Sequence, residues 1–76
     1  MKYDNLELRK ELISAIVEQI KIKELKQHDA AILLKIRQPK VCLLMNKKIE
    51  NFRLEKLIEL AGRVDLQVDL DIKLTT

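Results

Sequence analysis

Apolar residues recur at intervals of three and four along the first third of the chain, which is the spacing of one face of an α-helix. The pattern predicts a core helix over about 5–23. Asp4 and Glu7 lie three residues apart at its start, as in a capping box that satisfies free backbone N–H groups. The residues expected on the buried face are Leu12, Ile13, Ile16, Val17 and Ile20.

Two short segments follow, separated by a break at 35–37. The first, over about 27–34, contains Ala30 and Ala31, whose small side chains suit a short helix that a neighbour crosses closely. Pro39 then fits the first turn of the next helix, where its missing N–H would have had no partner. That helix should end near Asn46.

The helix after the break has two unlike faces. One is apolar and is expected to point to the core through Val41, Leu44 and Met45. The opposite face places polar side chains at four-residue steps, the distance between neighbours on one side of a helix. Its members are Gln38, Cys42 and Asn46, with Pro39 and Leu43 beside them.

The last part of the chain changes its period. A fourth apolar stripe predicts a helix that opens near Asn51 and ends at about residue 64; its members are Leu54, Leu57, Ile58, Ala61 and Val64. After Asp65, apolar and polar residues alternate, which is typical of a strand. A single strand leaves its backbone groups unpaired, so we expect pairing with another chain, most simply a twofold mate. The expected dimerisation residues are Leu66, Val68, Leu70 and Ile72, and Leu60 is expected on the same partner surface.

Composition narrows the chemistry. Of 76 residues, 47% are hydrophobic and 36% charged, which favours a compact soluble domain. One Gly, one Cys and one His leave too little for a glycine-cradled phosphate site, an intramolecular disulfide or a zinc site. We therefore expect no enzyme, no metal and no cofactor. Since no signal peptide or long apolar run is evident, we expect a cytoplasmic protein without membrane contact.

The net charge of +3 is unevenly distributed. Residues 1–25 sum to zero, residues 26–48 have six cations against Asp29 for a net +5, and residues 49–76 sum to −2. A basic middle segment is what a surface facing an anion needs. A lysine-rich solvated face would give the same sum, and charge alone leaves both interpretations open.

The two short helices inside this basic stretch have the form of a helix-turn-helix. Segment 26–41, KQHDAAILLKIRQPKV, resembles the Xre/Cro family of DNA-binding domains, whose pattern is roughly Thr-Gln-x-Glu-Ala-Ala-x-x-Leu-Gly-Ile-Ser-Gln-Pro-x-Val. The resemblance covers about 6–64 and is strongest to small HigA-like antitoxins. The matching residues are Gln27, Ala30, Ala31, Leu34, Ile36, Gln38, Pro39 and Val41.

The resemblance implies a mainly α fold: a lambda-repressor-like domain of four to five helices over 1–64, with the helix-turn-helix at about 27–46. A C-terminal β-strand over 65–76 would pair between chains. Gln38 would read an adenine edge in the major groove, and Gln27 would contact a phosphate. The expected DNA-binding residues are Gln27, Arg37, Gln38, Lys40, Cys42, Leu43, Asn46, Lys47 and Lys48.

At four positions a cation replaces the residue type that the family prefers. Lys35 replaces the turn Gly, where a left-handed backbone would cost roughly 1 kcal/mol for any side chain. Lys26 and Arg37 replace the helix-capping Ser or Thr, and Lys47 replaces the Gly common after the third helix. A lost cap costs typically about 1 kcal/mol. The chain thus exchanges local stability for positive charge near the expected DNA surface.

The resulting hypothesis is a homodimeric, sequence-specific repressor that binds two half-sites of double-stranded DNA. The resemblance adds an antitoxin role, with a ribonuclease-type toxin as partner and repression of the shared promoter. Two alternatives remain open: a protein-interaction module that has kept the fold without DNA binding, and a Cro-like phage regulator without a toxin partner.

Overall fold

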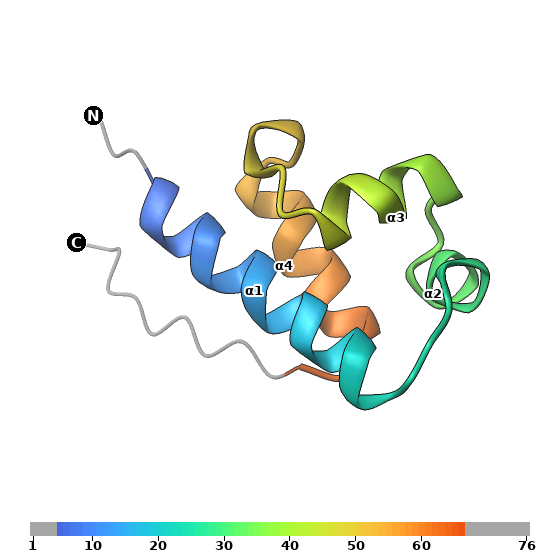
Figure 1. The fold of residues 1–76 in the computed structure, drawn as a ribbon. Coiled ribbons are helices and arrows are strands. Elements are labelled where there is room, and N and C mark those ends of the chain that lie inside the picture. Colours follow the sequence, from blue (N-terminus) through green and yellow to red (C-terminus); the bar gives the residue numbers. More distant parts are fainter. Residues whose placement is uncertain (1–4, 67–76) are drawn as a thin grey trace.

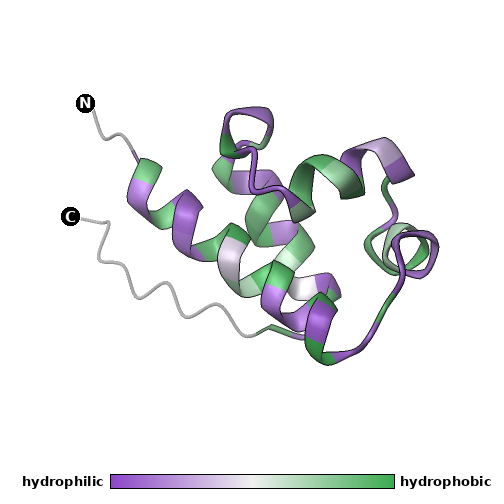
Figure 2. Cartoon of the chain, viewed as in Figure 1, coloured by the Kyte–Doolittle hydropathy of each residue, from purple (hydrophilic) through white to green (hydrophobic). Residues whose placement is uncertain are grey.

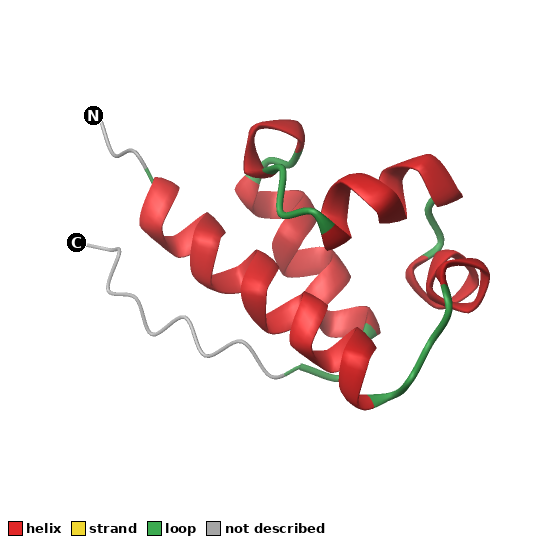
Figure 3. Ribbon diagram, in the orientation of Figure 1, coloured by secondary structure: helices red, strands yellow, loops and turns green. Residues whose placement is uncertain are grey.

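The computed structural model of the protein describes residues 5–66. Over this range the chain forms α1 (Leu6–Ile22), α2 (Gln27–Leu34), α3 (Gln38–Met45), the 3-10 helix η1 (Ile49–Asn51) and α4 (Leu54–Arg63) (Figures 1 and 3). The mainly helical fold and the order of the helices are as predicted.

One helix start differs from the prediction. Asn51 was expected to cap the fourth helix, but it ends η1, and α4 begins after Arg53. The connection between α3 and α4 is therefore partly helical, and its Phe52 is buried in the core. The apolar stripe correctly placed α4, whereas the capping preference of Asn pointed to the wrong residue.

The predicted terminal strand lies almost wholly outside the described residues, and so do Val68, Leu70 and Ile72. Leu66 is described, and it follows the end of α4. Its backbone N–H donates to the Ala61 carbonyl at 2.9 Å, and its half-buried side chain packs against the core. Within the described range Leu66 thus belongs to the helix end rather than to a strand.

The core lies between the α1 and α4 pair and the shorter α2 and α3 (Figure 1). Along α1 and α4, apolar residues recur at helical spacing between polar ones, as expected for helices with one buried face (Figure 2). Leu60 is fully buried, which corrects its expected place on a partner surface. The buried residues are Leu12, Ile13, Ile16, Val17, Ile20, Ala30, Ala31, Leu34, Val41, Leu44, Phe52, Leu57, Leu60, Ala61 and Val64.

Two arginines connect the long helices to the rest of the domain. Arg63 of α4 donates from Nη1 to the Leu34 carbonyl at the end of α2, at 2.8 Å. Arg9 of α1 donates from Nη1 to the carbonyls of Ile49 and Phe52, at 3.2 and 3.3 Å. Helix ends leave carbonyls without intrahelical partners, so Arg63 satisfies a group that α2 cannot satisfy by itself.

All four α-helices end in the same way, although none ends on glycine. A left-handed residue follows each helix, directly after α2 and one residue later after α1, α3 and α4: φ is 56° at Glu24, 60° at Lys35, 54° at Lys47 and 63° at Asp65. The next N–H then reaches back five residues, as in Leu25 to Ile20 and Ile36 to Ala31, both at 3.1 Å. This is the Schellman arrangement, which normally favours Gly. Lys35 and Lys47 therefore occupy the strained positions where the family pattern has Gly.

Within the described residues, the N-terminal ends of the helices have no side-chain capping hydrogen bonds. Lys26, Arg37 and Arg53 precede α2, α3 and α4 in extended conformation, and none makes a side-chain capping bond. Asn5 precedes α1 and its side chain also makes no capping bond; Asp4 of the predicted capping box lies outside the described residues. The expected loss of the α2 and α3 caps is confirmed.

Candidate nucleic-acid interface

Helix α3 is held so that one face is buried and the other is open. Val41 and Leu44 are completely buried, while Gln38, Cys42 and Asn46 are exposed. The break at 35–37 turns the chain between α2 and α3, and both helices pack against each other through buried apolar residues. The predicted polar face of α3 is thus a solvent-facing surface.

Gln38 stands at the first turn of α3, where it meets the first turn of α2. Its Nε2 lies 3.4 Å from Nδ1 of His28. Both side chains are exposed, and Gln27 is exposed beside His28. The tertiary structure therefore brings together the starts of the two short helices, which are ten residues apart in the chain.

The other end of the α3 face is ordered by Asn46. Its Nδ2 donates to the Cys42 carbonyl at 2.9 Å and lies 3.6 Å from the Cys42 Sγ. Cys42 is a free, exposed thiol. These contacts join Cys42 and Asn46, and the four-residue spacing puts the exposed Gln38 on the same side of α3.

Lys40 and Leu43, both among the expected DNA-binding residues, also make contacts within the domain. The Lys40 Nζ is 3.2 Å from the Asn51 carbonyl and 4.9 Å from the centre of the Phe52 ring. Its charge is thus directed to η1 and away from Gln38. Leu43 is half-buried and packs against the core, so part of this side chain is engaged inside the domain.

Comparison with protein families matches residues 1–73 to a family described as a helix-turn-helix domain. The chain belongs to that family. Comparisons with curated proteins and with solved structures give no match. The match spans the whole described range, and it agrees with the packed α2, turn and α3. Membership supports DNA binding, whereas the narrower Xre or HigA-like assignment goes beyond it.

Cations of the helix-turn-helix domain gather at both ends of α3. Lys35 and Arg37 lie in the turn before the helix, and Lys47 and Lys48 follow it; all four are exposed. The left-handed backbone at Lys35 and Lys47 keeps both in tight turns next to the helix. A cationic group thus stands at each end of the polar face, which is the distribution needed to contact phosphates on either side of a groove.

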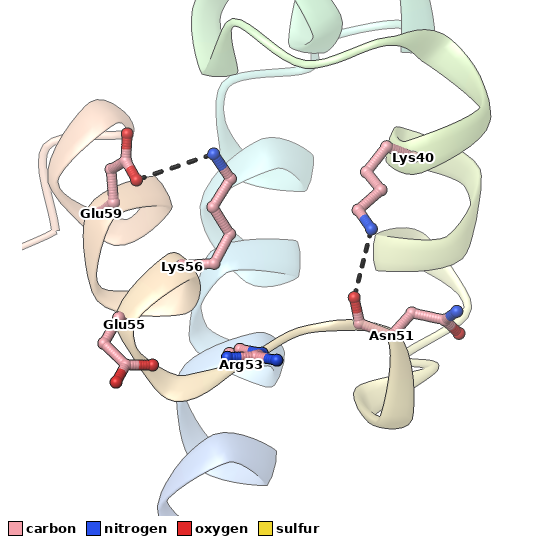
Figure 4. Close-up of a pocket in the computed structure, with 6 residues that line it drawn as sticks. All are labelled: Lys40, Asn51, Arg53, Glu55, Lys56 and Glu59. Atoms are coloured by element: carbon pink, nitrogen blue, oxygen red, sulfur yellow. Dashed lines mark hydrogen bonds and ion pairs between the residues drawn. The ribbon is translucent and has the colours of Figure 1, made fainter.

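Two further cations were missed by the sequence analysis. Arg53 and Lys56 at the start of α4 line a shallow hollow of about 540 Å³ that also contains the Lys40 side chain (Figure 4). Lys56 is 3.6 Å from Glu59. These cations escaped notice because residues 49–76 are acidic in sum; counting charge by segment hid two basic residues that the fold brings next to α3.

Among residues 5–66 there is no group of three or more His, Cys, Asp or Glu side chains arranged to hold a metal ion. In the same range no helix has both the length and the apolar character required to cross a membrane.

Proposed function

We propose that the protein is a sequence-specific DNA-binding repressor whose helix α3 enters the major groove. The observation that carries this proposal is the exposed face of Gln38, Cys42 and Asn46, held outward by buried Val41 and Leu44. The major groove accepts an α-helix and presents a distinct pattern of donors and acceptors for each base pair. The role is one of binding rather than catalysis.

Gln38 is the residue best suited to read a base. A glutamine amide has an acceptor and a donor side by side, and it can form two hydrogen bonds with the N6 and N7 edge of adenine. Gln38 is exposed at the first turn of α3, and residues at the start of a recognition helix are those that reach base edges. The adenine preference should therefore depend on this one side chain.

The cations around α3 orient the protein on DNA and raise its affinity for DNA, but they do not read the base sequence. Lys35, Arg37, Lys47 and Lys48 are placed to neutralise phosphates. Each neutralised phosphate releases counterions, so affinity should fall steeply as salt rises. Gln27 at the start of α2 is the proposed phosphate contact on the neighbouring helix.

The test compares Gln38→Ala with Lys48→Ala on duplexes selected from a random library by the wild-type protein. Gln38→Ala should lose about 1–3 kcal/mol of discrimination at one adenine position and keep the salt dependence. Lys48→Ala should weaken binding to all duplexes alike and lower the salt slope by about one. Equal loss on all sequences for Gln38→Ala would contradict base reading.

The proposal includes a homodimer, which rests on the alternating sequence of 66–74. Two recognition helices would then meet half-sites about 34 Å apart, one turn of the duplex. A chain lacking 69–76 should sediment as a monomer and bind only a single half-site. A dimer of unchanged size would place the interface elsewhere.

The proposal also includes an antitoxin role, which rests on the resemblance to small HigA-like proteins. A ribonuclease-type toxin encoded next to the gene should be neutralised when both proteins are produced together. If no toxic reading frame adjoins the gene, the Cro-like regulator is the better account. The DNA-binding proposal stands in either case.

A protein-interaction module is the second candidate. The large apolar side chains of Ile22 and Ile32 are 62% and 64% exposed, and Leu33 is 37% exposed. Such residues are typical of partner contacts when they form a patch. Failure to select any duplex from the random library would favour this candidate over the repressor.

A further inference from the structure

One contact near the proposed DNA surface joins a histidine ring to the residue proposed to read a base. Nε2 of Gln38 lies 3.4 Å from Nδ1 of His28. His28 is in the first turn of α2 and Gln38 in the first turn of α3. The pair therefore bridges the two helices at the point where Gln38 would meet the duplex.

The chemistry of the two groups determines how they can share this contact. A neutral imidazole has one nitrogen that donates and one that accepts. When Nδ1 is the accepting nitrogen, it accepts a hydrogen bond from the Gln38 amide nitrogen. The N–H that Gln38 donates to it is the one that points away from the amide oxygen. The remaining N–H and Oε1 then lie side by side on the free edge, which is the pair of groups that adenine requires.

The opposite arrangement would reverse the order of donor and acceptor. If position 28 presented only a donor, Gln38 would turn its oxygen to it, and the amide nitrogen and oxygen would exchange places on the free edge. At the same position in the groove, the nitrogen would face the adenine N6 donor and the oxygen would face the N7 acceptor. Both contacts would then be repulsive.

We propose that His28 is a positioning residue that fixes the orientation of the Gln38 amide, so that the two residues together set the base preference. This inference rests on the proposed function. It also accounts for His28 being placed against Gln38 rather than facing solvent alone. His28 touches no base; it acts through Gln38.

The experiment measures discrimination at the position that loses its adenine preference in Gln38→Ala. His28→Ala should reduce this discrimination several-fold, towards the Gln38→Ala level. His28→Lys, which can only donate, should abolish it as fully as Gln38→Ala, about 5- to 150-fold for a 1–3 kcal/mol contact. His28→Asn has an oxygen near the Nδ1 position and should retain most of the preference.

Two comparisons isolate the coupling. In the Gln38→Ala background, His28→Ala and His28→Lys should leave the base preference unchanged, because the side chain they orient is gone. Asp29→Asn, at an exposed position in the same turn, should leave the preference intact in the wild-type background. Thermal melting of each variant checks that the domain is folded.

The outcomes separate this inference from the function on which it rests. If the wild-type protein discriminates among no duplexes, the proposed function is overturned. If Gln38→Ala relaxes the preference but His28→Lys retains it, His28 does not orient Gln38. If His28→Ala weakens all duplexes equally and keeps the preference, His28 contacts phosphate, and the positioning role is wrong.

Discussion

The α1 and α4 pair and the α2 and α3 unit are built from the same kinds of residue but stabilised differently. Helix α1 has 17 residues and buries five apolar side chains, whereas α2 and α3 have eight residues each and bury three and two. Isolated helices shorter than about 12–15 residues are marginal in water. Helix α4, with ten residues, is also below this length, so α2, α3 and α4 all depend on packing in the shared core, where α1 is the one helix of greater length among the described residues.

The difference shows how a domain of this size frees a surface for binding. Arg63 completes the end of α2, and buried Leu34, Val41 and Leu44 attach α2 and α3 to the shared core. Because the buried Val41 and Leu44 lie on one side of α3, its other side is left exposed to solvent. The long pair supplies stability, and the short unit supplies the exposed polar face.

The largest predicted effect tests whether the two parts form one core. Leu34→Ala in α2 and Leu57→Ala in α4 each remove a fully buried side chain, and each should cost about 2–5 kcal/mol of unfolding free energy. Denaturant unfolding followed by circular dichroism should remain a single transition for both. A separate early transition in Leu34→Ala would show that the long pair folds without the short unit.

The next effect tests the connection made by Arg63. Arg63→Ala leaves the Leu34 carbonyl without its 2.8 Å partner and should cost about 1–2 kcal/mol. The matched control is Glu59→Ala, which removes the neighbouring exposed ion pairs with Arg63 and Lys56 and should cost less than about 1 kcal/mol. Urea denaturation measures both. Equal losses would mean that the ion pair, and not the carbonyl contact, is what stabilises the domain.

A third variant separates stability from DNA affinity. Arg37→Ser restores a side-chain cap at the start of α3 and should stabilise the domain by about 1 kcal/mol. It also removes a cation beside the polar face, so the salt slope of DNA binding should fall by about one. Melting and salt titration are measured on the same preparation. A gain in stability without any change in the salt slope would remove Arg37 from the interface.

The smallest effect concerns the left-handed turn between the short helices. Lys35→Gly removes the strain of a side chain at φ 60° and should stabilise the domain by roughly 0.5–1 kcal/mol. Lys35→Ala keeps the strain and removes the same charge, so it should give no such gain. If both variants stabilise equally, relief of charge repulsion is the cause.

The sequence predicted the helices well because their signals are local. The three-and-four spacing identified α1 and α4, and the break around Lys35 placed the limits of α2 at the residues observed. Family resemblance identified Lys35 and Lys47 as glycine replacements, and both have positive φ. Asn51 and Leu60 were misassigned, since neither the 3-10 turn nor the depth of α4 in the core is determined by local preference alone.

The exposed face of α3 was determined by the sequence itself, because the period of a helix fixes which side chains share a side. The partners of that face were decided only by the tertiary structure. Packing brings His28 to 3.4 Å from Gln38 and directs Lys40 to Asn51. It also places Arg53 and Lys56 next to α3. Contacts between separate helices depend on crossing geometry and on the length of the connections, and these depend on the whole core at once.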